Sequence, residues 1–152
     1  MPWIKVWIHF VWTTANHEPW LSDEIRPAVL QHIRENARKK GIFIDMINGY
    51  LDHVHCLISL GSNQTLEDIV RLIKGESSHW INHNHLTSTK FRWQKEYFAV
   101  SVNPAGLNPV RRYIANQEEH HHTSDFKQEF ADFLKRAGFE KFEEKEVPYF
   151  QS

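Results

Sequence analysis

The order of hydrophobic patterns along the chain is the feature that most restricts its fold. Segment 4–12 is dense in β-branched and aromatic residues, as expected of a buried strand. Three more strand patterns follow, at 42–47, at 53–60 and within 91–102, where 97–102 is the clearest part. Two stretches with apolar residues at helical spacing separate the first strand from the second and the third from the fourth. The order is therefore β-α-β-β-α-β.

Local signals place the ends of the two helices. The first is predicted to begin at Ser22, which precedes two carboxylates, and to stop at Gly41. The second opens at Thr65 in the manner of a capping box. Between the middle strands, the Asn48-Gly49 pair predicts a hairpin turn. This arrangement predicts an α+β, ferredoxin-like split βαβ core over residues 1–104, with two helices on one face of an antiparallel sheet.

Two additional helices are expected after this core, within residues 105–138. The first runs from Asn108-Pro109 through Tyr113 to the 118–119 region. The second presents one apolar face and stops near Gly138; that face comprises Phe126, Phe130, Phe133 and Leu134. Residues 139–152 form a charged, loosely held tail. We find no linker that would divide the chain, so 1–152 is expected to be one domain.

Composition excludes several classes of protein. Cys56 is the single cysteine among 152 residues, so neither an internal disulfide nor a cysteine-rich zinc site can form. No segment approaches the ~18 to 20 apolar residues of a membrane span, and a cytoplasmic protein is expected. The formal net charge of -1 does not fit nonspecific coating of duplex DNA. A nucleic-acid partner would have to meet a local patch.

The His53-Val54-His55 motif is the first candidate for chemistry. Residues two apart on a strand project from the same face, so both imidazoles can reach one metal ion. The same pattern also fits two histidines that hydrogen-bond within a polar sheet face.

Tyr113 and Gln117 form a second candidate pair, because four residues on a helix return to the same face. A helix laid on the sheet would present both to the histidine pair. The alternatives are a packing role for Tyr113 and a solvated side chain for Gln117.

Together these residues suit phosphoryl chemistry. A tyrosine hydroxyl has an ordinary pKa of about 10, so as a nucleophile it needs an activated electrophile and good positioning. A metal ion on the scissile phosphate supplies the activation. Two imidazoles and an amide oxygen leave positions open for phosphate and water, which favours Mg or Mn, with Mn the better match to nitrogen ligands.

At this point the chain resembles the single-tyrosine transposases of the HUH superfamily, which move single-stranded bacterial insertion sequences and include the REP-associated tyrosine transposases. The resemblance covers nearly the whole chain, and five segments carry it: 7–14, 48–58, 72–78, 93–97 and 113–121. It implies that His53 and His55 are the metal-binding pair, that Gln117 is the third ligand, and that Tyr113 is the nucleophile.

The resemblance further implies a DNA transposase that cleaves single-stranded DNA through a 5′-phosphotyrosine link, with a free 3′-hydroxyl that later rejoins strands. The implied partners are DNA hairpins at the element ends and a second copy of the chain. In similar homodimers the tyrosine helix of one subunit usually completes the active site of the other.

Other residues have weaker assignments. A local phosphate-binding or base-stacking patch is predicted from Lys74, Ser77, Ser78, Lys90, Arg92, Trp93 and Lys95, although ordinary surface or core packing explains each of them as well. His120 and His121 follow Gln117 and could support the metal ligands, or simply lie at a solvated helix end.

Two other functions remain open. The same histidine and tyrosine chemistry serves relaxases and rolling-circle replication initiators, although the short chain and the position of Tyr113 disfavour them. A noncatalytic nucleic-acid-binding module would use aromatic residues exposed on the sheet and would not need Tyr113.

Overall fold

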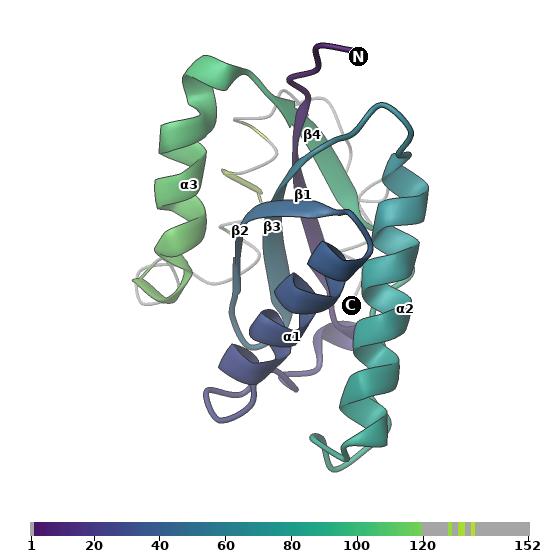
Figure 1. Ribbon diagram of the computed structural model, residues 1–152. Helices are drawn as coiled ribbons and strands as arrows, with labels where there is room; N and C mark the ends of the chain where they lie inside the picture. The colour runs from purple at the N-terminus through teal and green to yellow at the C-terminus, as the bar shows by residue number, and fades with distance from the viewer. Residues whose placement is uncertain (1, 120–127, 129–130, 133–134, 136–152) are drawn as a thin grey trace.

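The computed structural model describes residues 2–119 together with residues 128, 131, 132 and 135. Its centre is an antiparallel sheet with strand order β2-β3-β1-β4 (Figure 1). The four strands are β1 (Trp7–Thr13), β2 (Phe43–Gly49), β3 (His53–Ser59) and β4 (Phe98–Val102). Helices α1 (Arg26–Lys39) and α2 (Leu66–His83) follow β1 and β3, so the predicted ferredoxin-like order is confirmed.

Alternation along the strands gives the sheet two different faces. Ile8, Phe10 and Trp12 of β1 point into the hydrophobic core with the even-numbered residues of β3. Helices α1 and α2 pack against each other over this face (Figure 1). The odd-numbered residues of β1 and β3 therefore lie on the other face. A third helix, α3 (Leu107–Ala115), contacts β2 and β3.

The first strand and helix both start later than predicted. β1 begins at Trp7, and residues 2–6 are exposed and extend beyond the sheet. α1 begins at Arg26, and no side chain caps it, so the predicted cap at Ser22 is wrong. The guanidinium of Arg26 instead donates to Asp23 at 2.7 Å. The predicted stop is confirmed, because Gly41 has a φ of 74° just beyond the helix.

The connection expected at residues 48–52 from the Asn48-Gly49 signal is shorter in the structure, and Asn48-Gly49 is not its turn. Both residues belong to β2, and the turn lies at 50–52. Gly49 is needed for close approach, since a Cβ there would lie 2.3 Å from the carbonyl oxygen of His53. Because Asn48 lies in β2 and not in the turn, its side chain can contact α3.

The chain between α2 and α3 also differs from the prediction. Residues 91–97 are irregular, and only 98–102 form β4. Phe91 is fully buried in the core, and Trp93 makes an isolated bridge to Thr14 beyond the end of β1. A short 3-10 turn (Pro104–Gly106) then leads into α3. In the second predicted C-terminal helix, residues 128, 131, 132 and 135 are helical, whereas the predicted apolar face lies outside the described residues: Phe126, Phe130, Phe133 and Leu134.

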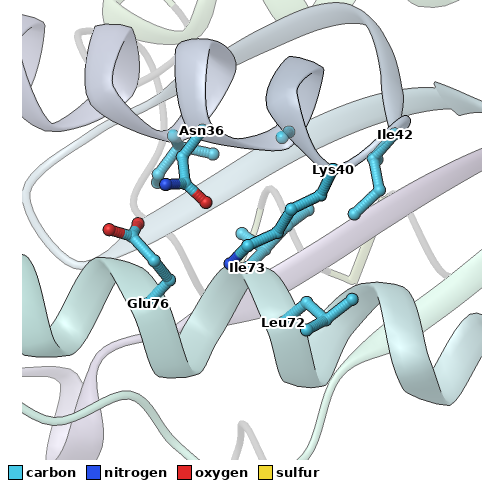
Figure 2. Close-up of a pocket in the computed structure, with 8 residues that line it drawn as sticks. Asn36, Lys40, Ile42, Leu72, Ile73 and Glu76 are labelled. Atoms are coloured by element: carbon cyan, nitrogen blue, oxygen red, sulfur yellow. The ribbon is translucent and has the colours of Figure 1, made fainter.

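A small pocket between α1 and α2 is shown in Figure 2. Its volume is about 10 Å³, which is room for roughly one water molecule. The Glu76 carboxylate at its rim is already paired with His32, at 2.7 Å. This pocket is too small to serve as a substrate site.

Among the described helices, none is long and apolar enough to cross a membrane.

Candidate active site

The face of the sheet opposite α1 and α2 carries three buried histidines. His53 and His55 alternate with core residues along β3, and His9 lies beside them on β1. They are 0%, 1% and 3% exposed. The Nε2 atom of His9 lies 2.9 Å from Nδ1 of His55. Strand alternation thus builds a polar cluster on this face, as the histidine spacing predicted.

Two residues predicted to share a helical face meet this cluster. The ring of Tyr113, on α3, lies 5.4 Å from the ring of His55, edge to face at 84°. Gln117 lies one turn further along the chain and is fully buried. Its Oε1 atom is 3.1 Å from Nε2 of His53. The structure therefore brings all four predicted residues together within one chain.

The orientation of the Gln117 amide follows from its hydrogen bonds. Its Nε2 group donates to the carbonyl oxygen of Tyr113 at 3.2 Å, so its Oε1 atom faces His53. On the other side of the ring, Nδ1 of His53 lies 2.9 Å from the Asp52 carboxylate. A proton on Nδ1 leaves a lone pair on Nε2. In that tautomer the lone pairs of His53 Nε2 and Gln117 Oε1 would face each other, an arrangement that a cation would stabilise, whereas a proton on Nε2 would donate to Oε1.

These donor atoms suit a divalent ion. Adjacent ligands at about 2.1 Å from an octahedral ion lie about 3 Å apart, close to the separation between His53 and Gln117. His55 has its Nδ1 atom turned toward His9, which leaves Nε2 as the atom that can bind metal. Within the described residues, no group of three or more His, Cys, Asp or Glu side chains is arranged for a metal. The third candidate donor beside the two histidines is the amide oxygen of Gln117, a residue type outside that set.

Asp52 is a residue of the site that the sequence did not single out. Burial alone would raise its pKa, but hydrogen bonds from His17 and His53 together hold that pKa well below its usual value. The carboxylate therefore stays ionised at neutral pH. A carboxylate behind a histidine fixes the tautomer of the ring and makes Nε2 a better metal ligand.

We expect Asp52→Asn to weaken Mn²⁺ binding about 10- to 100-fold, because the neutral amide no longer fixes the ring of His53 by charge. Titration calorimetry with MnCl₂ measures this change. Asp68→Asn, at an exposed carboxylate on α2, is the control and should bind Mn²⁺ as the unmodified protein does. Equal affinities for both variants would contradict a role for Asp52 in the site.

Two contacts from β2 hold α3 against the sheet. The side chain of Asn48 donates to the carbonyls of Ile114 at 3.0 Å and Ala115 at 3.2 Å, at the C-terminal end of the helix. Asp45 accepts two hydrogen bonds from Arg111, at 2.8 and 2.9 Å. Both contacts flank the turn that carries Tyr113. They position the tyrosine and Gln117 over the histidines of the same chain.

Asn48→Ala is expected to slow the DNA cleavage that the sequence resemblance implies, about 10- to 100-fold, while leaving affinity for DNA nearly unchanged. The reason is that small errors in the position of a nucleophile cost rate and not binding. Single-turnover cleavage and fluorescence anisotropy measure the two quantities. Asn63→Ala, at an exposed asparagine in the loop before α2, is the control. A parallel loss of DNA affinity would argue against a positioning role.

Part of the predicted DNA-binding patch lies inside the fold. Burial lowers the pKa of Lys74 to about 8, although Glu96 opposes the shift. The ammonium of Lys74 donates to the carbonyls of Gln94, Lys95 and Glu96. Lys74 thus links α2 by hydrogen bonds to residues 94–96, in the irregular segment before β4.

Ser77 and Trp93 also have internal partners. Ser77 is fully buried, and its hydroxyl donates to the carbonyl of Ile73 at 2.6 Å and accepts from the indole of Trp93 at 2.9 Å. A buried side chain offers no surface to DNA in this conformation. The interpretation of Ser77 as a DNA contact is therefore corrected, and the half-buried Trp93 packs against Trp12 and Phe91.

The remaining members of the predicted patch lie at or near the surface. Ser78 is half-buried and donates to the carbonyl of Gly75 at 3.1 Å. Lys90, Arg92 and Lys95 are exposed. The backbone carbonyl of Arg92 accepts from Ala15 at 2.9 Å, which places this basic segment beside the end of β1. His120 and His121 lie outside the described residues.

Comparisons with known proteins find similar sequences and similar structures. Residues 3–117 match the family model described as Transposase IS200 like. The ISDra2 transposase TnpA of Deinococcus radiodurans is 22% identical over 116 residues, covering 73% of this chain and 83% of that protein.

Two solved structures share the fold. One, from Deinococcus radiodurans R1 and described as that of a transposase, has a TM-score of 0.62 and 23% identity, and covers 76% of this chain and 93% of its own. The other is a REP-associated tyrosine transposase bound to a REP hairpin, with a TM-score of 0.60 and 19% identity over 80% of this chain and 72% of its own.

Proposed function

Because the match over residues 3–117 shows that the chain belongs to the family of IS200-like transposases, we propose that it cleaves and rejoins single-stranded DNA with Tyr113 as its nucleophile. The single observation that carries this proposal is the convergence of Tyr113, Gln117, His53 and His55 on one face of the sheet.

In this mechanism the phenolic oxygen of Tyr113 attacks the scissile phosphorus. The new bond joins the tyrosine to the 5′-phosphate, and the bond from phosphorus to the 3′ oxygen breaks. The phenol loses one proton and the departing 3′ oxygen gains one, so no net proton is consumed. The phosphotyrosine keeps the energy of the phosphodiester, so a 3′-hydroxyl can reverse the step and rejoin strands without a nucleotide cofactor.

His53, His55 and Gln117 are proposed to hold the divalent ion, Mg or Mn. When bound, this ion polarises the scissile phosphate and offsets charge on its oxygens. The protein contributes the fixed directions of the donor atoms, since Asp52 and His9 orient the two imidazoles from behind. Burial of the cluster excludes bulk water from its inner side.

The substrate is proposed to be a DNA hairpin at the end of an insertion element, with the exposed Lys90, Arg92 and Lys95 near its backbone. This proposal is supported by the relative that was solved with a REP hairpin. We also propose a homodimer in which each chain builds its own site, because Asn48 and Asp45 hold α3 against the sheet of the same chain.

The noncatalytic alternative fits the sheet less well. A nucleic-acid-binding sheet of that kind presents exposed aromatic residues for stacking. Here the corresponding face carries buried histidines, and α3 lies against β2 and β3. The relaxase alternative is disfavoured by the family match.

A direct test uses a single-stranded oligonucleotide with the hairpin sequence that flanks the gene in its source genome. The protein is incubated with it and MnCl₂ or MgCl₂, and the products are separated on a denaturing gel. We expect a covalent protein-DNA species that requires the metal and single-stranded DNA. If such DNA is neither cut nor attached under any of these conditions, the proposed function is wrong.

A further inference from the structure

We propose that the hydroxyl of Thr13 is a further part of the metal site and hydrogen-bonds to a water molecule held by the ion. This inference rests on the proposed function, because it needs a divalent ion at His53. Thr13 would act as a positioning residue for that ion, because no described residue hydrogen-bonds to its hydroxyl.

The place of Thr13 in the sheet directs its side chain to the site. Thr13 is the last residue of β1 and pairs directly with His53 of β3. Because side chains alternate along a strand, Thr13 lies on the same face of β1 as His9. Val11, which lies between them on that face, pairs with His55. Directly opposed residues in an antiparallel sheet have Cβ atoms about 4.5 to 5.5 Å apart. The side chains of Thr13 and His53 therefore start from adjacent positions on the same face of the sheet.

The hydroxyl of Thr13 is buried without a hydrogen bond. The residue is 0% exposed, and within the described part of the chain its Oγ1 atom has no hydrogen-bond partner. The adjacent Thr14 is different, since its hydroxyl donates to the carbonyl of Glu18 at 2.7 Å. The backbone carbonyl of Thr13 is also satisfied, by the N–H of Gln94 at 2.9 Å. The hydroxyl of Thr13 has no such partner among the described residues.

An unsatisfied buried hydroxyl destabilises a protein, and valine has nearly the same shape and favours strands equally. A threonine at this position is explained if a non-protein group supplies the missing hydrogen bond. A divalent ion held by two imidazoles and an amide keeps water on its remaining positions. Such a water molecule, next to His53, is the partner that the position of Thr13 favours.

The test is Thr13→Val, which removes the hydroxyl and keeps the side-chain volume, with Thr13→Ser as the rescue variant. Affinity for MnCl₂ without DNA is measured by calorimetry, and the urea midpoint is measured on metal-free protein. We expect Thr13→Val to bind Mn²⁺ about tenfold more weakly. Its metal-free midpoint should be equal to or above that of the unmodified protein. Thr13→Ser should bind nearly as the unmodified protein does.

The outcomes separate this inference from the proposed function. If the unmodified protein does not bind Mn²⁺, the metal site itself is wrong and the inference fails with it. If the unmodified protein and Thr13→Val bind equally well, only the role of Thr13 is overturned. A lower midpoint of metal-free Thr13→Val would also overturn it, because the hydroxyl would then serve the fold.

Discussion

Tyr113→Phe is expected to abolish DNA cleavage and covalent attachment, because no other group at the site replaces the phenolic oxygen as nucleophile. Phenylalanine keeps the ring that packs edge to face on His55. Folding, Mn²⁺ affinity and DNA affinity should therefore remain close to those of the unmodified protein. Denaturing gels measure attachment, and calorimetry and anisotropy measure the two affinities.

Tyr97→Phe is the matched control for this variant. Tyr97 packs on Phe10 at the core edge, with ring centroids 6.1 Å apart, and takes no part in the proposed chemistry. The Tyr97→Phe variant should form the covalent protein-DNA species at the rate of the unmodified protein. Persistence of the covalent species in Tyr113→Phe would show that another residue is the nucleophile.

The second large effect is expected from His53→Asn. Asparagine keeps a polar group near the position of Nδ1, toward Asp52, but it lacks the Nε2 atom that faces Gln117. Mn²⁺ affinity should fall more than about 100-fold, beyond the loss expected for a group that only supports a ligand. Cleavage should be lost with it. Calorimetry and the gel assay measure both effects.

His83→Asn provides the control, since His83 is an exposed histidine at the end of α2. It should retain both metal binding and cleavage. Unchanged Mn²⁺ affinity in His53→Asn would place the metal elsewhere, and cleavage without any divalent ion would remove the need for it.

Periodicity in the sequence predicted which residues share a face within a single strand or helix. Period two placed His53 and His55 on one strand face, and the four-residue spacing placed Tyr113 and Gln117 on one side of a helix. Cys56 alternates with these histidines along β3 and lies in the core, where burial raises the pKa of its thiol. These predictions needed no knowledge of which elements are neighbours.

The remaining parts depend on pairing between distant segments, which periodicity does not specify. Asn48-Gly49 looks like a turn because such pairs favour turns. In the structure the glycine permits a close backbone approach and the asparagine holds α3. Likewise, His9 and Thr13 become site residues only through the register between β1 and β3. In the sequence, the sign of their role was His9 itself, a histidine that alternates with the core residues Ile8 and Phe10 on the first strand.

The environment of a charged residue is also hard to predict from the sequence, for a related reason. Lys74 was expected to meet phosphate, but its ammonium is used by the backbone carbonyls of residues 94–96. The sequence pattern around a helical lysine is the same whether the lysine faces solvent or an irregular segment of its own chain. Its environment is set by the path of residues 91–97, which carries no periodic pattern.

The bond proposed between Tyr113 and DNA is tested most directly by the mass of the linked peptide. The covalent species formed on hairpin DNA with MnCl₂ is digested with protease and nuclease and sequenced by mass spectrometry. We predict one modified peptide, with a nucleotide 5′-phosphate attached to Tyr113. Attachment at any other residue, or through a 3′-phosphate, would contradict the mechanism.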